Sequence, residues 1–229
     1  MKIRWIGQSG YILKTNETEI ILDPYLSDIV NRVANRPRLV EAPIVPSKIK
    51  ADAVVCTHNH LDHLDVDAIA KMNRELRFIT TGEGKEKLRE MGYENVVSLQ
   101  VGDCIRIKDI EIQAVYANHT VEAFGVIVKG EGQTLYFSGD TLFDEKLYEV
   151  ALKQPDITFI CINGKLGNMN VEEAVRTAKA IGAKVNVPNH YGMFASNTEN
   201  PERFTTEMDN GFIMEFNREY ETCDILQGR

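Results

Sequence analysis

The stretch Thr57-His58-Asn59-His60-Leu61-Asp62-His63 places four potential metal ligands within six positions. It follows residues 51–56, a short apolar run bounded by polar residues, which predicts a buried strand that ends at the motif. In an extended chain His58 and His60 can point to the same side, whereas the adjacent Asp62 and His63 must diverge. This arrangement favours two neighbouring metal ions over one.

A simpler interpretation is a polar loop that opens a helix over residues 65–72, with Asp62 or Asp65 as its N-cap. Capping accounts for one aspartate but leaves the three histidines of the motif without a role.

Length and composition predict one globular domain over residues 1–229. The chain is 43% hydrophobic and contains no Gly-, Ser- or Pro-rich linker. The first residues enter a strand-like alternation instead of a signal peptide, and no apolar run approaches the ~20 residues of a membrane span. Four dispersed cysteines without a C-x-x-C pair indicate buried free thiols in a reducing compartment. We therefore expect a soluble, cytoplasmic protein that does not bind membranes. The sequence does not determine the oligomeric state, and a homo-oligomer is possible.

The formal net charge of -8 argues against nucleic acid as a partner. Residues 31–50 depart from this average, because five basic residues and one acidic residue give the segment a local charge of +4. The segment is either a solvated loop or a wall that attracts an anionic small-molecule substrate. Its charged residues are Arg32, Arg36, Arg38, Glu41, Lys48 and Lys50.

Hydrophobic patterning predicts an α/β (α+β) fold of two mixed sheets flanked by helices. Residues 2–7, 11–14 and 19–22 read as an antiparallel meander, and residues 25–50 as a long irregular excursion. Later strands alternate with helices, which favours layered packing. We expect helices at 66–73, 84–91, 144–153, 171–181 and 201–208, and strands at 77–80, 95–99, 104–107, 110–116, 124–128, 134–138, 157–162, 184–187 and 212–216.

All five histidines of the chain lie just past the end of a predicted strand. His119 follows the strand at 110–116, His190 follows the strand at 184–187, and Asp140 follows the strand at 134–138. A lone histidine is usually a surface or core residue, but this shared position indicates one common site. Asp23, next to Pro24, is either a turn former or a partner that orients a ligand histidine.

The H-x-H-x-D-H motif, followed by single His, Asp and His positions, resembles the metallo-β-lactamase superfamily. Residues 36–63 and 181–194 are similar to segments of L-ascorbate-6-phosphate lactonases, although the long N-terminal extension of that enzyme is missing. The resemblance implies a four-layer αβ/βα sandwich with a dinuclear metal site. By position, one metal would bind His58, His60 and His119, the other Asp62, His63 and His190, with Asp140 bridging. It also implies catalytic roles for Asp62, Asp140 and His190.

A site of five imidazoles and two carboxylates, without thiolate, suits two divalent ions, Zn or Mn, with Fe as a further option. Two such ions, the two carboxylates and a metal-bound hydroxide nucleophile leave a charge near +1, which favours an anionic substrate. The diiron relatives of this fold would be expected to carry Glu at position 60, so electron transfer is disfavoured. Candidate substrate contacts are Asn163, Lys165, Tyr191, Arg36 and Arg38.

Three functions compete at this level. The leading hypothesis is a lactonase that opens a phosphorylated or otherwise anionic sugar lactone. The second is a phosphodiesterase that acts on a small phosphodiester or cyclic nucleotide. The third is a non-enzymatic scaffold that senses a ligand, which the complete set of seven candidate ligands disfavours.

Overall fold

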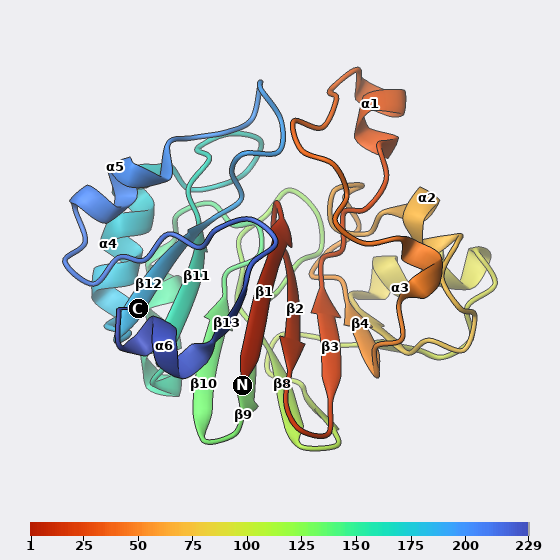
Figure 1. The fold of residues 1–229 in the computed structure, drawn as a ribbon, viewed down its shortest axis with the longest axis horizontal. Helices are drawn as coiled ribbons and strands as arrows, with labels where there is room; N and C mark the ends of the chain where they lie inside the picture. The colour runs from red at the N-terminus through yellow and green to blue at the C-terminus, as the bar shows by residue number, and fades with distance from the viewer. Residues whose placement is uncertain (229) are drawn as a thin grey trace.

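The computed structural model describes residues 1–228, which form two mixed sheets with helices on both outer sides (Figure 1). Helices α2 and α3 lie on one side of the pair of sheets, and α4 and α5 lie on the other. This is the αβ/βα sandwich that the sequence predicts.

The first sheet has seven strands in the order β13-β1-β2-β3-β4-β5-β6. Its β13 to β3 portion is antiparallel, and the portion from β3 to β6 is parallel. The strands are β1 (Lys2–Gly7), β2 (Gly10–Lys14), β3 (Glu19–Leu22), β4 (Ala53–Val55), β5 (Phe78–Thr80), β6 (Val96–Ser98) and β13 (Glu219–Glu221).

The second sheet has six strands in the order β12-β11-β10-β9-β8-β7. Strands β7 to β10 are antiparallel, and β10, β11 and β12 are parallel. The strands are β7 (Cys104–Ile107), β8 (Ile110–Val115), β9 (Gly125–Gly130), β10 (Gln133–Phe137), β11 (Ile157–Cys161) and β12 (Val185–Asn189).

The helices include two of the tighter 3-10 type, η1 and η2. Of these two, only η2 was predicted from the sequence, as a helix over residues 144–153 whose type was not specified. The helices are α1 (Ile29–Ala34), η1 (Pro46–Lys48), α2 (Val66–Ile69), α3 (Gly82–Glu90), η2 (Glu145–Lys153), α4 (Val171–Ile181), α5 (Pro201–Thr206) and α6 (Thr222–Leu226).

Side-chain alternation along the strands sorts the apolar residues into layers. In β3, Ile20 and Leu22 face the core between the sheets, whereas Ile21 packs against the layer that contains α2 and α3. Tyr11 of the first sheet meets Phe137 and Phe159 of the second, with ring centroids 5.1 and 5.0 Å apart. The two sheets are therefore joined by one continuous apolar core.

The prediction of a closing strand at residues 212–216 is wrong. These residues alternate because Met214 is buried and Phe212 packs edge-on against Tyr220, but their backbone joins no ladder. The strand that closes the first sheet is β13, which begins seven residues after Phe212 and pairs with β1 on the side opposite β2. The apolar alternation at residues 212–216 reflects side-chain burial. Strand pairing with β1 depends instead on a contact between residues far apart in the sequence.

Two cysteines also depart from expectation. Cys56 and Cys161 are buried free thiols, whereas Cys104 and Cys223 are exposed. Cys104 lies on β7, an edge strand, with its side chain on the solvent side of the alternation. Among residues 1–228, no helix is long and apolar enough to cross a membrane.

Candidate metal centre

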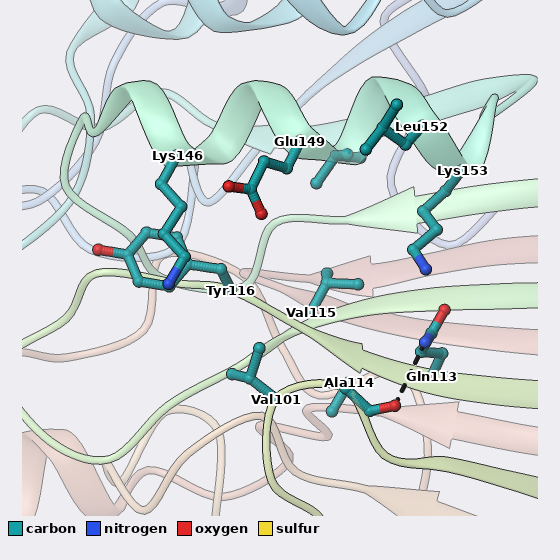
Figure 2. Close-up of a pocket in the computed structure, with 11 residues that line it drawn as sticks. Val101, Gln113, Ala114, Val115, Tyr116, Lys146, Glu149, Leu152 and Lys153 are labelled. Carbon is teal, nitrogen blue, oxygen red and sulfur yellow. Dashed lines mark hydrogen bonds between the residues drawn. The ribbon is translucent and has the colours of Figure 1, made fainter.

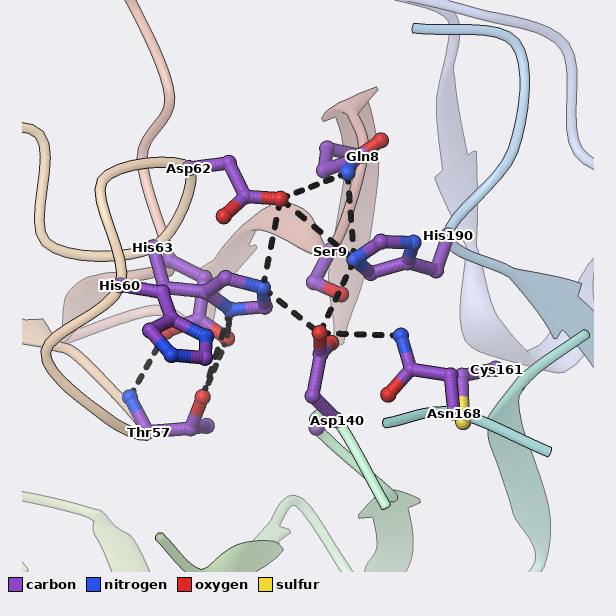
Figure 3. A network of polar contacts seen from close by, with 12 residues as sticks. Gln8, Ser9, Thr57, His60, Asp62, His63, Asp140, Cys161, Asn168 and His190 are labelled. Carbon is purple, nitrogen blue, oxygen red and sulfur yellow. Dashed lines mark hydrogen bonds and ion pairs between the residues drawn. The ribbon is translucent and has the colours of Figure 1, made fainter. Parts of the chain in front are cut away.

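The fold brings all seven predicted ligands together at the ends of strands. Figure 3 shows five of them, His60, Asp62, His63, Asp140 and His190. Four belong to the loop after β4, and the others follow β8, β10 and β12. They form three overlapping groups in which the ligand atoms lie within 4.8 Å of one another. The first group is His58, His60 and His119, the second group is Asp62, His63 and His190, and the set that joins them is His58, His63 and Asp140.

The first group contains imidazoles only. His60 Nδ1 lies 3.0 Å from His58 Nε2 and 3.1 Å from His119 Nε2. Tetrahedral zinc with Zn–N bonds of about 2.0–2.1 Å sets ligand nitrogens roughly 3.3 Å apart. The three nitrogens are therefore spaced as ligands of a single ion.

The second group contains Asp62, His63 and His190, with Asp140 between it and the first group. His190 Nε2 lies 3.6 Å from Asp62 Oδ2 and 3.2 Å from Asp140 Oδ2. The other oxygen of Asp140 lies 3.1 Å from His63 Nε2. Because Asp140 also shares a ligand group with His58, which belongs to the first group, its carboxylate can face both halves of the site.

Three ligand imidazoles are oriented through their second nitrogen. His63 Nδ1 lies 2.8 Å from Asp23 Oδ2, and His119 Nδ1 lies 3.0 Å from the Gly167 carbonyl. His58 Nδ1 lies 3.1 Å from Thr57 Oγ1. Each contact turns Nε2 toward the site, as outer partners of metal-binding histidines do.

Asp23 combines both roles considered from the sequence. Its φ of 40° places it in the left-handed region, as a turn residue, and its carboxylate also accepts from Thr57 N at 2.7 Å. The partnership with His63 confirms that Asp23 orients a predicted ligand.

The imidazoles of the first group are held neutral. Burial lowers the pKa of His58 well below its usual value, and the nearby His63 lowers it further. Burial also lowers the pKa of His60 and of His119. Neutral imidazole is the form that binds metal ions.

The second group has the opposite electrostatics. Burial acts to lower the pKa of His63, but Asp140, Asp23 and Asp62 outweigh it and raise that pKa well above its usual value. In the same way, Asp140 and Asp62 overcome burial and raise the pKa of His190 to about 9. Burial would raise the pKa of Asp62 and of Asp140, yet the two imidazoles lower both. Without metal, protons on these imidazoles compensate the carboxylates.

Buried polar atoms that lack a hydrogen-bond partner among residues 1–228 concentrate at this site. His63 Nε2 and Asp140 Oδ1 are 3.1 Å apart, within ion-pair distance, but they do not have the geometry of a hydrogen bond. Each buried unpartnered group costs about 1–3 kcal/mol, so such groups mark positions where a ligand is expected. Both atoms fit a shared cation. Five of the nine atoms of this kind lie here: Gln8 Oε1, His63 Nε2, Asp140 Oδ1, Asn168 Oδ1 and His190 Nδ1.

A chain of side-chain amides supports Asp140. Asn168 Nδ2 donates to Asp140 Oδ2 at 2.9 Å and to Asn163 Oδ1 at 3.0 Å. Asn163 in turn donates to Asn197 Oδ1 at 2.8 Å. Asn163, which the sequence predicts to contact substrate, is buried within this series of amides and is connected to Asp140 through Asn168.

The other predicted substrate contacts lie in different surroundings. Tyr191 is buried against Trp5, with ring centroids 4.9 Å apart. Lys165 is exposed, and its Nζ donates to the Ser196 carbonyl at 3.3 Å. Of this pair, only Lys165 presents its polar group at the surface.

Two of the five basic residues in the segment at 31–50 are engaged by other residues of the protein, Arg32 and Arg38. Arg38 donates through Nη1 to the carbonyls of Tyr25 and Ser27 at 2.9 and 2.8 Å, and its guanidinium lies 4.6 Å from the centroid of the Tyr25 ring. Arg32 pairs with Asp67 at 2.8 Å. Arg36 is half-buried and makes no side-chain hydrogen bond or ion pair with the described residues.

A separate hollow lies on the outer face of the second sheet, beneath η2 (Figure 2). Its volume is about 240 Å³, and Lys146 and Lys153 stand toward opposite ends of it. None of the seven predicted ligands lines it. The floor and walls include Val101, Ala114, Val115, Val150 and Leu152.

Sequence reasoning missed Gln8, which contacts Asp62 and His190 from the turn between β1 and β2. The available signal was a glutamine between Gly7 and Gly10 at the first predicted bend. Nothing in that local pattern indicates that the turn reaches the motif 54 residues away.

Comparison with known proteins agrees with this geometry. The Beta-lactamase superfamily domain matches residues 18–191, which is more than half of the chain. The chain is 28% identical over 224 residues to a UPF0173 metal-dependent hydrolase from Methanopyrus kandleri, covering 91% of this chain and 92% of that one.

Two solved structures share the fold. A metallo hydrolase from the archaeon Ignicoccus hospitalis has a TM-score of 0.77 at 22% identity, covering 96% of this chain and 98% of that one. An isothiocyanate hydrolase from Delia radicum gut bacteria has a TM-score of 0.80 at 20% identity, covering 96% and 99%. With the family match over residues 18–191, these findings show that the chain belongs to the metallo-β-lactamase superfamily.

Proposed function

We propose that this chain, a metal-dependent hydrolase of the metallo-β-lactamase superfamily, opens the lactone ring of a small anionic sugar acid. The observation that carries the proposal is the position of Asp140: its ligand oxygen lies within 4.8 Å of a nitrogen of His58 in the first group, and its two oxygens lie 3.1 Å from His63 and 3.2 Å from His190 in the second group. A carboxylate between two groups of ligands fits a dinuclear hydrolytic centre with Zn or Mn, or with Fe.

Divalent ions at such a centre lower the pKa of bound water to about 7 and polarise a substrate carbonyl. The chain's own residues set the charge around that chemistry. Asp62 and Asp140 are held ionised, because His63 and His190 lower the pKa of each. Under this proposal, Asp62, Asp140 and His190 are the catalytic residues.

The choice of an anionic substrate depends on fewer residues than the sequence suggested. Arg38 and Arg32 are engaged by the protein itself. The candidate anion contacts that remain are Arg36 and Lys165, which is exposed and makes only a 3.3 Å bond to the Ser196 carbonyl. The preference for an anion therefore depends on these two side chains and on the positive charge of the metal centre.

The proposal is tested with purified protein stripped by chelator and reloaded with Zn or Mn. Acid release is followed on a panel of neutral, carboxylated and phosphorylated sugar lactones, together with a chromogenic phosphodiester and an isothiocyanate. We expect metal-dependent acid release that is fastest with anionic lactones. Absence of lactone opening by the metal-loaded protein would overturn the proposal, and faster phosphodiester turnover would favour the phosphodiesterase hypothesis.

The matched variants are Asp140→Ala and Asp209→Ala. Asp140 is buried at the centre, whereas Asp209 is exposed near the start of the segment between α5 and β13. We expect Asp140→Ala to abolish hydrolysis and Asp209→Ala to retain it. A biological effect that survives Asp140→Ala would support the ligand-sensing scaffold instead.

A further inference from the structure

Gln8 occupies a strained and buried position in the turn between β1 and β2. Its φ is 53°, in the left-handed region that side chains other than glycine rarely adopt, and its exposed fraction is 0%. The indole nitrogen of Trp5 donates to its backbone carbonyl at 2.9 Å. Such strain persists only where surrounding contacts hold it, and it clusters at functional sites.

The Gln8 side chain points its amide nitrogen at the candidate centre (Figure 3). Nε2 donates to Asp62 Oδ2 at 2.8 Å and lies 3.1 Å from His190 Nε2. Its oxygen faces away from these two residues, buried and without a partner among residues 1–228. The reverse orientation would bring two oxygens to 2.8 Å, so the Asp62 carboxylate fixes the amide nitrogen inward.

We propose that Gln8 is a positioning residue, which holds the Asp62 carboxylate in place for the half of the site made by Asp62, His63 and His190. Within residues 1–228, Gln8 gives Asp62 its only hydrogen bond. The other carboxylate of the centre, Asp140, is held similarly by the amide of Asn168. A neutral amide suits this task, because a cationic donor would repel the ion that the carboxylate is placed to bind.

This inference depends on the proposed metal centre, and it concerns one half of it. His190 Nε2 cannot accept from the Gln8 amide when it is protonated or when it binds an ion, so the contact of Gln8 that matters here is with Asp62. The histidines of the first group make no hydrogen bond with Gln8. Loss of the amide should therefore weaken one metal equivalent and spare the other.

The first test is metal titration of Gln8→Met against the wild-type protein, with Gln100→Met as control. Gln100 is an exposed glutamine distant in sequence from every ligand. We expect one of two metal equivalents to bind about 10–100-fold more weakly in Gln8→Met, as loss of an outer partner does elsewhere. Gln8→Asn keeps an amide that tolerates this φ but is too short, and it should show the same loss if Gln8→Met fails to fold.

The second test uses unfolding of the metal-free protein in a double-mutant cycle of Gln8→Met and Asp62→Ala. If Gln8 acts through Asp62, the double variant loses less stability than the sum of the single variants. Additive losses, or a variant that binds both equivalents as the wild type does, would overturn the inference. A wild-type protein that binds fewer than two ions would instead refute the dinuclear centre, and the metal-free cycle would still test the Gln8 contact.

Discussion

Asp23 Oδ2 lies 2.8 Å from His63 Nδ1, and both side chains are almost completely buried. The same carboxylate accepts from the backbone and hydroxyl of Thr57 at 2.7 and 2.8 Å. Asp23 thus joins the end of β3 to the first residues of the ligand loop and orients one imidazole of the centre.

Asp23→Asn should weaken metal binding while keeping the fold. Asparagine tolerates the left-handed φ of 40°, but it removes the charge that favours the His63 Nδ1 proton. We expect metal affinity to fall by about 10–100-fold in a chelator competition assay. Asp209→Asn, at an exposed position, is the control, and equal affinities in the two variants would contradict the orienting role of Asp23.

Gly167→Ala should damage the first group of ligands specifically. Gly167 has a φ of 91°, and an added Cβ would lie 2.9 Å from both Cε1 and Nδ1 of His119. Gly182→Ala is the matched control, because its φ is 73° but nothing lies within 4 Å of the added carbon. Both variants should lose roughly 1–2 kcal/mol of stability from backbone strain. Only Gly167→Ala should also lose metal affinity, and equal affinities would show that His119 does not need this contact.

The sequence predicted the cluster of candidate ligands because residues that follow predicted strands can be identified from the local pattern, and the family resemblance assigned them as ligands. The motif follows β4, and His119, Asp140 and His190 follow strands whose apolar runs were recognisable. In a layered fold such strand ends meet at one edge, so the fold class and the cluster were predicted together.

The sequence could not predict contacts that depend on the exact three-dimensional position of one side chain. Arg38 was predicted to contact the substrate, but its Nε and Nη1 donate to the carbonyls of Tyr25, Ser27 and Val40. Because every residue has a backbone carbonyl, the sequence does not indicate which carbonyls will accept from an arginine. Gln8 was missed for a related reason, since its role depends on a turn that reaches Asp62 across the fold.

Stability of the metal-free protein should fall as the pH rises through the titration of His190. The pKa of His190 is raised from 6.5 to about 9, so its stabilising contribution is complete below pH 6.5 and is lost as the pH rises through about 9. The lowered pKa values of Asp62 and Asp140 change the free energy of unfolding only at acidic pH, below the usual pKa of a carboxyl group. They therefore do not oppose the effect of His190 at higher pH. Urea unfolding of chelator-treated protein across this interval measures the effect.

Metal binding should show the opposite dependence, because an ion displaces the protons of the second group. Over the same interval, affinity for one metal equivalent should increase with pH. His190→Asn, which tolerates the left-handed φ of 62°, should reduce both trends. A metal-free protein whose stability is constant over this interval would contradict the proposed charge balance.

Arg36→Ala and Arg38→Ala should separate substrate recognition from structure. Arg38 is half-buried and satisfies three backbone carbonyls, so its loss should cost about 1–3 kcal/mol in the free energy of unfolding. Arg36 has no such partners among the described residues, so Arg36→Ala should change stability by less than about 0.5 kcal/mol. Under the proposed function, Arg36→Ala should raise KM for a phosphorylated lactone and leave KM for a neutral lactone unchanged. An Arg38→Ala variant with a raised KM and unchanged stability would show that the guanidinium contacts substrate. The basic residues of the segment at 31–50 would then contribute to the active site.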